Sequence, residues 1–111
     1  MKISEMQQAA WQNSEDKGFH VGAENLNVPT KLMLIVSELS EALEEYRESK
    51  PLRYRIASNL EKPEGIAAEL ADVVIRVGDL AGILGFDLED AVREKMDYNS
   101  TRAFMHGGKK I

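Results

Sequence analysis

The chain has 111 residues, which suits one domain over residues 1–111, and a single core of that size buries only about two-thirds of the surface of the unfolded chain, so self-association would help it. It has no cysteine, which excludes disulfides, thiolate metal sites and cysteine nucleophiles, and no apolar run of the roughly 20 residues of a membrane span, so we expect a cytoplasmic protein without membrane contact. The net charge of -5 at pH 7 argues against long nucleic acid as a partner, because such binding depends on an excess of Lys and Arg.

The first predicted helix covers residues 4–17. Ser4 is followed three residues later by Gln7, which has the form of a capping box, and helical spacing continues as far as the first glycine. Residues 18–28 contain glycines and asparagines and no sustained period, so the sequence predicts a loop there.

The second predicted helix covers residues 29–49. Pro29 suits the first turn of a helix, apolar side chains from Leu32 onward repeat on one helix face, and Pro51 lies beyond the end. Residues 50–63 contain prolines and basic side chains but little periodicity, so they are predicted to be a loop that connects helices within one domain.

Two further helices complete the predicted fold. The third begins at Pro63 and is expected to end at Gly82 or Gly85. Asp87 with Asp90 three residues on resembles an N-terminal cap, from which a fourth helix is expected to run to about Met105, followed by a frayed tail over residues 106–111. No segment has the alternating pattern of a strand, so we predict an all-α, four-helix bundle-like fold.

Two pairs of carboxylates stand out on the two central helices. Glu38 and Glu41 are three residues apart, with Glu45 four residues further, so these side chains form one stripe at 3.6 residues per turn. Glu69 and Asp72 repeat the spacing on the third helix, and two such pairs can face each other within a bundle. Four carboxylates suit a hard cation, and Mg²⁺ fits when phosphates and waters complete its octahedron.

A solvated acidic face is the main alternative for the stripe on the second helix. On the third helix, an ion pair between Asp72 and Arg76 would explain Asp72 but would leave Glu69 without a partner. Zinc is disfavoured because cysteine is absent and only His20 and His106 could supply nitrogen ligands.

Basic and polar side chains share one side of the fourth helix. Lys95, Asn99 and Arg102 could contact phosphate oxygens and a sugar or base edge. Alternatively, Lys95 and Arg102 complement the carboxyl end of the helix and extend into solvent, which explains them equally well.

Aromatic side chains near the N-terminus form a second candidate contact with a nucleotide. Trp11, Phe19 and His20 could sandwich a nucleobase, because every base has a π face. Core packing is the stronger interpretation for Trp11, since a single tryptophan in a small helical domain is usually buried.

The acidic pairs resemble those of the MazG-like superfamily of all-α nucleoside triphosphate pyrophosphatases, whose pattern is Glu-x-x-Glu on one helix and Glu-x-x-Asp on the next. Here the pairs are Glu38-Leu39-Ser40-Glu41 and Glu69-Leu70-Ala71-Asp72, and residues 95–102 have a similar Lys-x-x-x-Asn-x-x-Arg arrangement. The resemblance covers roughly residues 6–102. Many members carry a further glutamate where this chain has Ser37.

The resemblance implies a function. A (deoxy)nucleoside triphosphate would be cleaved to the monophosphate and pyrophosphate by a metal-activated water that attacks the α-phosphorus, with Lys95 and Asn99 on the nucleotide. It also implies a homodimer or homotetramer with a pocket near the subunit interface, to which Arg53 or Arg55 of the middle loop could contribute. The residues implied to hold Mg²⁺ are Glu38, Glu41, Glu69 and Asp72, the first three being the candidates for catalysis.

Two other functions stay open at this point. Phosphoribosyl-ATP pyrophosphatase belongs to the same superfamily and would share the acidic pairs. The alternative of a different class is a non-catalytic helical binding or oligomerisation module whose acidic residues only keep it soluble. Magnesium and nucleotide would then leave its thermal stability unchanged.

Overall fold

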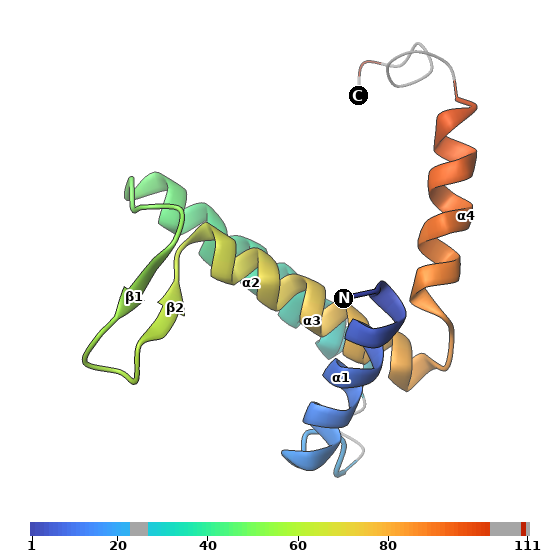
Figure 1. Cartoon of the computed structure of the whole chain (residues 1–111), viewed down its shortest axis with the longest axis horizontal. Coiled ribbons are helices and arrows are strands. Elements are labelled where there is room, and N and C mark those ends of the chain that lie inside the picture. Colours follow the sequence, from blue (N-terminus) through green and yellow to red (C-terminus); the bar gives the residue numbers. More distant parts are fainter. Residues whose placement is uncertain (23–26, 103–109, 111) are drawn as a thin grey trace.

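The computed structural model describes residues 1–22, 27–102 and 110, and within these ranges the chain forms four helices and one short β-hairpin (Figure 1). The helices are α1 (Ile3–Asp16), α2 (Val28–Arg47), α3 (Ile66–Leu84) and α4 (Leu88–Ser100). Strands β1 (Tyr54–Ile56) and β2 (Lys62–Glu64) pair antiparallel, with Arg55 opposite Pro63. The prediction of a mainly helical chain is confirmed. The expected continuation of the fourth helix to Met105 and the expected frayed tail, apart from Lys110, lie outside the described residues.

The two longest helices, α2 and α3, lie side by side and run in opposite directions, and α1 packs against α3 (Figure 1). Glycines allow α1 to come close. A Cβ atom at Gly78 would lie 2.8 Å from Met6 Sδ, and one at Gly82 would lie 2.6 Å from Trp11 Cδ1. The core is small, and its buried apolar residues in the described part of the chain are Ala10, Ala42, Leu80 and Ala81.

The start of α1 differs from the predicted one. Lys2, and not Ser4, precedes the helix, and the Lys2 N–H donates a hydrogen bond to Glu5 Oε1 at 3.0 Å. Gln7, the expected partner of the predicted cap, instead reaches the turn between α3 and α4, where its Nε2 donates to the carbonyl oxygen of Phe86 at 2.8 Å. The side chain thus ties α1 to that turn.

The starts of α2 and α4 follow the sequence signals. Pro29 lies in the first turn of α2, where Asn27 Oδ1 accepts a hydrogen bond from the Thr30 N–H at 3.0 Å. Asp87 caps α4, because its Oδ1 accepts from the Asp90 N–H at 3.2 Å. These side chains satisfy N–H groups that have no partner inside a helix.

Residues 50–64 are the main correction to the predicted fold. The segment was expected to be a loop with the third helix starting at residue 63, but it contains the β-hairpin, and α3 begins only at Ile66. Each strand has three residues, too few for an alternating pattern to stand out. Gly65 makes the turn into α3 at φ +102°, and a Cβ atom there would lie 2.4 Å from the carbonyl oxygen of Leu52.

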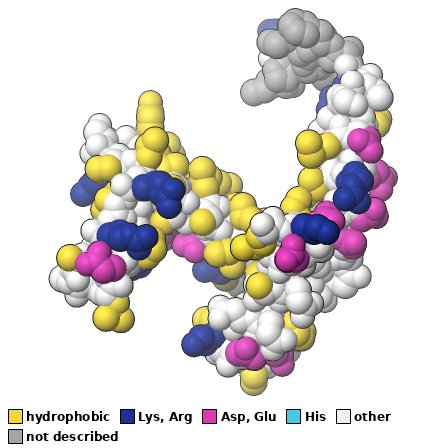
Figure 2. All heavy atoms as spheres, viewed as in Figure 1, with side chains coloured by type: hydrophobic (Ala, Val, Ile, Leu, Met, Phe, Trp, Pro, Cys, Tyr) yellow, Lys and Arg dark blue, Asp and Glu magenta, His cyan; other side chains and the backbone are white. Residues whose placement is uncertain are grey.

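Helix α4 stands apart from the other helices (Figure 1). None of its residues is buried, and it meets the body mainly through α1. The expected bundle is therefore formed by α1, α2 and α3, without α4, within one chain. On the face seen in Figure 2, acidic side chains gather along α4 and basic ones over the hairpin. None of the helices described is long and apolar enough to cross a membrane.

Candidate metal site between α2 and α3

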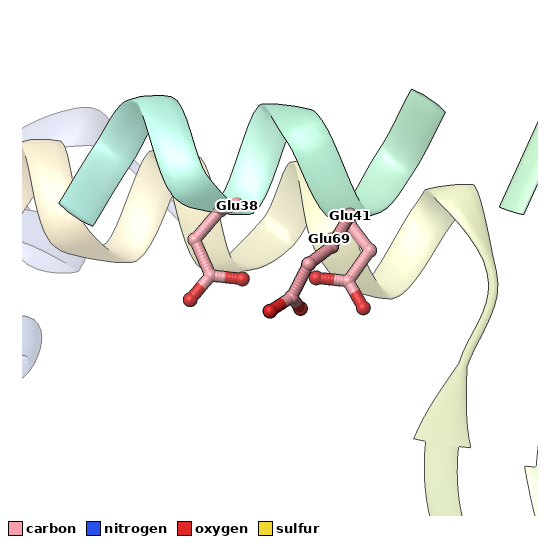
Figure 3. Close-up of side chains that lie close together, drawn as sticks. All are labelled: Glu38, Glu41 and Glu69. Carbon is pink, nitrogen blue, oxygen red and sulfur yellow. The ribbon is translucent and has the colours of Figure 1, made fainter. Parts of the chain in front are cut away.

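Three of the four predicted metal ligands lie together. Glu38 and Glu41 from α2 and Glu69 from α3 each place one carboxylate oxygen within 4.8 Å of the others, on the same side of the helix pair (Figure 3). The antiparallel packing of α2 on α3 brings the two motifs to one level, as their spacing on two helix faces predicts. We name Glu38, Glu41 and Glu69 the acidic cluster.

Glu69 is the buried member of the acidic cluster. Only 7% of the residue is exposed, and its Oε2 atom has no hydrogen-bond partner among the described residues. Burial, followed by the neighbouring Glu38 and Glu41, raises the pKa of Glu69 to about 8. A buried, unpaired carboxyl oxygen beside two further carboxylates is unfavourable, and a bound cation would satisfy it. The donor set therefore fits a hard, oxygen-preferring ion such as Mg²⁺.

Asp72 lies at the edge of this arrangement. It is not among the three residues whose oxygens converge, but it lines the same pocket as Glu38. Burial and then the charge of Glu38 raise the pKa of Asp72, whereas Arg76 lowers it. Asp72 is thus electrostatically coupled to the acidic cluster without being one of its three converging carboxylates.

Arg76 pairs differently from the alternative considered on sequence. Its Nε donates to Glu38 Oε1 across the two helices at 3.0 Å, whereas no ion pair with Asp72 is found among the described residues. The ion pair joins α3 to α2 next to the acidic cluster. Periodicity along a single helix could not reveal it, because it depends on how the two helices face each other.

A second acidic group lies towards the hairpin and shares Glu69. Oxygens of Glu45, Glu64 and Glu69 come within 4.8 Å of one another. Tyr54 Oη donates to both oxygens of Glu45, at 2.9 and 3.0 Å, and Lys62 Nζ lies 2.9 Å from Glu64 Oε1. This group already has hydrogen-bond donors from the hairpin. Sequence reasoning missed Glu64, Lys62 and Tyr54 because it did not predict the hairpin.

A pocket of about 480 Å³ opens beside the acidic cluster, between the end of α1, α2 and α3. Glu38 and Asp72 form part of its wall, and Phe19, which is mostly exposed, forms another part. Its volume is in the range that holds a small-molecule ligand. A ligand in this pocket would therefore contact both an aromatic ring and the carboxylates.

His20, predicted as a nucleotide contact, is engaged inside the protein. Its Nδ1 lies 2.7 Å from Glu15 Oε2 and its Nε2 lies 2.8 Å from Asp79 Oδ1, and its side chain is 8% exposed. Burial lowers the pKa of His20, but the hydrogen bonds to Asp79 and Glu15 outweigh this and raise it overall. Since both ring nitrogens face carboxylates, the geometry suits the doubly protonated imidazolium. Through these two contacts, His20 links α1 to α3.

The remaining predicted nucleotide contacts lie away from the pocket. Trp11 is only partly buried, lies against Gly82 of α3 and the His20 ring, with ring centres 5.2 Å apart, and does not line the pocket beside the acidic cluster. Lys95 and Asn99 on α4 and Arg102 just after it are exposed, with Lys95 Nζ 5.0 Å from the centre of the Tyr98 ring. In the described part of the chain, none of these side chains reaches the carboxylates of the same chain.

Comparisons with protein-family models, with curated proteins and with solved structures found no match for this chain, so its function has to be argued from the site itself.

Proposed function

We propose that this protein is a Mg²⁺-dependent nucleoside triphosphate pyrophosphohydrolase of the MazG-like kind, which converts a ribo- or deoxynucleoside triphosphate to the monophosphate and pyrophosphate. The observation that carries the proposal is Glu69, a buried carboxyl with an unpartnered oxygen between Glu38 and Glu41. Burial and then the neighbouring Glu38 and Glu41 raise the pKa of Glu69, and a divalent cation there would favour its ionised form. The order and spacing of the acidic pairs along the sequence supports the same assignment.

The chemistry follows from what carboxylates can do beside a triphosphate. Bound magnesium would lower the pKa of a coordinated water and offset the charge of the phosphates. The oxygen of an attacking water forms a bond to the α-phosphorus, and the bond from the α-phosphorus to the oxygen bridging to the β-phosphorus breaks. Pyrophosphate leaves with that electron pair. Glu38, Glu41 or Glu69 accepts the proton of the water, since an ionised carboxylate is an acceptor with free lone pairs.

The pocket beside the acidic cluster is the proposed place for the rest of the nucleotide. Its wall contains Glu38 and Asp72 together with Phe19, so phosphates near the carboxylates leave the base within reach of an aromatic ring. Asn13 and Thr30 also line it and can donate or accept hydrogen bonds. The pocket is therefore large enough and varied enough for a base and a sugar.

Self-association is part of the proposal, because one chain leaves much apolar surface open. Its accessible surface is 8563 Å², whereas a compact monomer of 12.4 kDa exposes about 6,100 Å². The excess of roughly 2,400 Å² is larger than the about 800 Å² per partner of a standard interface. A second copy can cover this surface and can bring Lys95 and Asn99 of its α4 to the pocket. A homodimer or homotetramer is thus the proposed assembly.

The test is an assay of the purified protein with ribo- and deoxynucleoside triphosphates and phosphoribosyl-ATP, with Mg²⁺ or with EDTA, and with products separated by ion exchange. A Glu38→Gln/Glu69→Gln variant removes two carboxyl groups from the acidic cluster, and Asp16→Asn/Glu61→Gln removes two exposed carboxyl groups that line neither the pocket nor the acidic cluster. We expect monophosphate and pyrophosphate from the wild type and the control variant only, and only with Mg²⁺. No turnover, or diphosphate made independently of Glu38 and Glu69, would sink the proposal. Mg²⁺ and nucleotide without effect on thermal stability would then favour the non-catalytic module.

A further inference from the structure

Arg76 stands where the acidic cluster meets the pocket. Its Nε donates to Glu38 Oε1 at 3.0 Å, and Arg76, Glu38 and Asp72 all line the 480 Å³ pocket. The Arg76 side chain is 42% exposed, whereas that of Glu38 is 14% exposed. One edge of the guanidinium therefore contacts a carboxylate, while the side chain stays open to the pocket.

The Arg76 guanidinium has N–H donors that are not used in hydrogen bonds among the described residues. Arginine carries five N–H donors in a planar fork, and only the one on Nε is used in a hydrogen bond among the described residues. The two terminal nitrogens hold the other four, in the geometry that matches two oxygens of one phosphate. Arg76 is also the only basic side chain in an ion pair with a member of the acidic cluster, as far as the chain is described.

A triphosphate beside three carboxylates needs positive charge from the protein as well as from a cation. Lys31 also lines the pocket, but Arg76 is the basic side chain already placed against Glu38. The same contact has a second effect. Because Arg76 Nε donates to Glu38 Oε1 at 3.0 Å, it places positive charge where a cation would bind and opposes that cation.

We propose that Arg76 binds a phosphate group of the nucleotide through its terminal nitrogens and competes with the divalent cation for Glu38 through Nε. This inference rests on the proposed function, and it adds a phosphate-binding residue from α3 that the acidic motifs do not include. Occupation of Glu38 by the cation releases the guanidinium towards the phosphate. Loading of metal and of nucleotide are thereby linked through one side chain.

The two roles predict opposite effects of one substitution. In Arg76→Gln, which removes the charge and the fork, Mn²⁺ in the absence of nucleotide should bind several-fold more tightly, because the competing cation is gone. Affinity for an uncleavable α,β-methylene nucleoside triphosphate in the presence of Mg²⁺ should fall by about tenfold to a hundredfold, the range of a lost charge-assisted hydrogen bond. Arg76→Lys keeps the positive charge but loses the planar fork of donors. It should bind Mn²⁺ as weakly as the wild type does, but it should recover only part of the affinity for the analogue.

The experiment measures Mn²⁺ binding by electron paramagnetic resonance and analogue binding by equilibrium dialysis, with circular dichroism to check that each variant is folded. Arg47→Gln is the matched control, since Arg47 forms an exposed ion pair with Glu44 at 3.0 Å on α2, and it should change neither affinity. Unchanged or weaker Mn²⁺ binding by Arg76→Gln overturns the competition, and unchanged analogue affinity overturns the phosphate contact. A wild type that binds the analogue without turning over triphosphates would refute the proposed reaction alone. A wild type that does not bind the analogue would refute both.

Discussion

Glu69 is the side chain of the site in which a negative charge is least favourable. It is buried, it shares its surroundings with two other carboxylates, and its pKa is raised to about 8. A folded-state pKa above the unfolded value means that the folded protein holds a proton that the unfolded chain releases. This contribution to stability is present below the unfolded pKa of 4.5 and is lost as the pH rises through about 8.

Glu69→Gln should therefore change how stability depends on pH. Glutamine has the shape of the protonated acid but does not titrate, so with EDTA present the variant should match the wild type near pH 5 and exceed it by a few degrees in melting temperature at pH 9. With Mg²⁺ present, the wild type should gain stability and the variant should gain much less. Thermal denaturation at fixed protein concentration measures both effects, and Glu61→Gln controls for the loss of one negative charge. A variant less stable than the wild type at pH 9 in EDTA would contradict this account of the site.

His20 should give a second, independent dependence on pH. Burial lowers its pKa, but the hydrogen bonds to Asp79 on α3 and Glu15 on α1 raise it overall above the ordinary histidine value of 6.5. A raised histidine pKa stabilises the fold fully below about pH 6.5, and the stabilisation disappears as the pH rises through the folded-state pKa. The imidazolium is then replaced by a neutral ring that can donate to only one of the two carboxylates.

The His20→Gln variant tests this link. The free energy of unfolding should fall by roughly 1 to 3 kcal/mol at pH 6, since charge-assisted hydrogen bonds are lost, and by less at pH 9. His106→Gln provides the control for the other histidine. Proton NMR of the wild type should follow one histidine that titrates above pH 6.5, and a His20 resonance that titrates below that value would rule out the proposed charge state.

The acidic motifs could be found from the sequence, but their surroundings could not. The i,i+3 spacing on two amphipathic helices identified Glu38, Glu41 and Glu69, and the structure brings these three together. The contact of Arg76 with Glu38 was not predicted, because it depends on how α2 faces α3. The position of Glu64 near Glu69 was not predicted, because it depends on the hairpin. Spacing predicts which side chains share a face of one helix, whereas partners across helices follow from packing.

At the scale of elements, the four helices were predictable and the hairpin was not. Helix periodicity extends over several turns, whereas β1 and β2 have three residues each, and β2 contains Pro63. Glycines also lie at both ends of α3, and the sequence did not show which of them precedes the helix and which ends it. Gly85, one of the two glycines predicted to end the third helix, ends α3 in the left-handed conformation, but Gly65 joins β2 to α3 inside a region predicted to be helical.

Gly65→Ala should cost more than an ordinary glycine substitution. At φ +102° and ψ 175° the backbone lies in a region that only glycine occupies readily, and an added Cβ atom would lie 2.4 Å from the carbonyl oxygen of Leu52. We expect a loss of about 2 to 4 kcal/mol in the free energy of unfolding, from backbone strain and the displaced carbonyl. Because Gly65 orients the hairpin, Mg²⁺ should also stabilise this variant less than the wild type.

Gly85→Ala is the matched control for that prediction. Its φ of +81° is also positive, but nothing lies within 4 Å of the added Cβ atom. The loss should be only about 1 kcal/mol, the difference between alanine and glycine in the left-handed region. Chemical denaturation of both variants gives the comparison, and equal losses would mean that the contact with Leu52 has no energetic consequence.

At the scale of the whole molecule, one chain leaves its long helices half covered. An apolar stripe on α2 is exposed along most of the helix, and α4 extends from the body without any buried residue. The radius of gyration of 16.6 Å exceeds the about 13 Å of a compact domain of this length. The exposed stripe consists of Leu32, Val36, Leu39, Leu43 and Tyr46. Its spacing of three and four residues is that of a helix–helix contact, so a second copy is the partner that it fits.

The oligomer should depend on this stripe. Light scattering coupled to size exclusion should give at least twice the chain mass of 12.4 kDa for the wild type, and the melting temperature should rise with protein concentration. Val36→Glu/Leu43→Glu places two charges in the stripe. This variant should be monomeric and have a lower melting temperature, because buried charges without partners are unfavourable. Leu60→Glu, at a fully exposed position in the turn of the hairpin, should leave mass and stability unchanged.

The same double variant connects assembly to activity. Lys95 and Asn99 do not line the pocket of their own chain. If they act on the pocket of a second copy, the monomeric variant should lose turnover even where it stays folded. Mn²⁺ binding should persist in it, since the acidic cluster comes from α2 and α3 of one chain. Full activity in the monomeric variant would mean that α4 of another copy is not needed. The nucleotide would then be held by residues of one chain alone, with Arg76 and Lys31 as the basic side chains in reach of its phosphates.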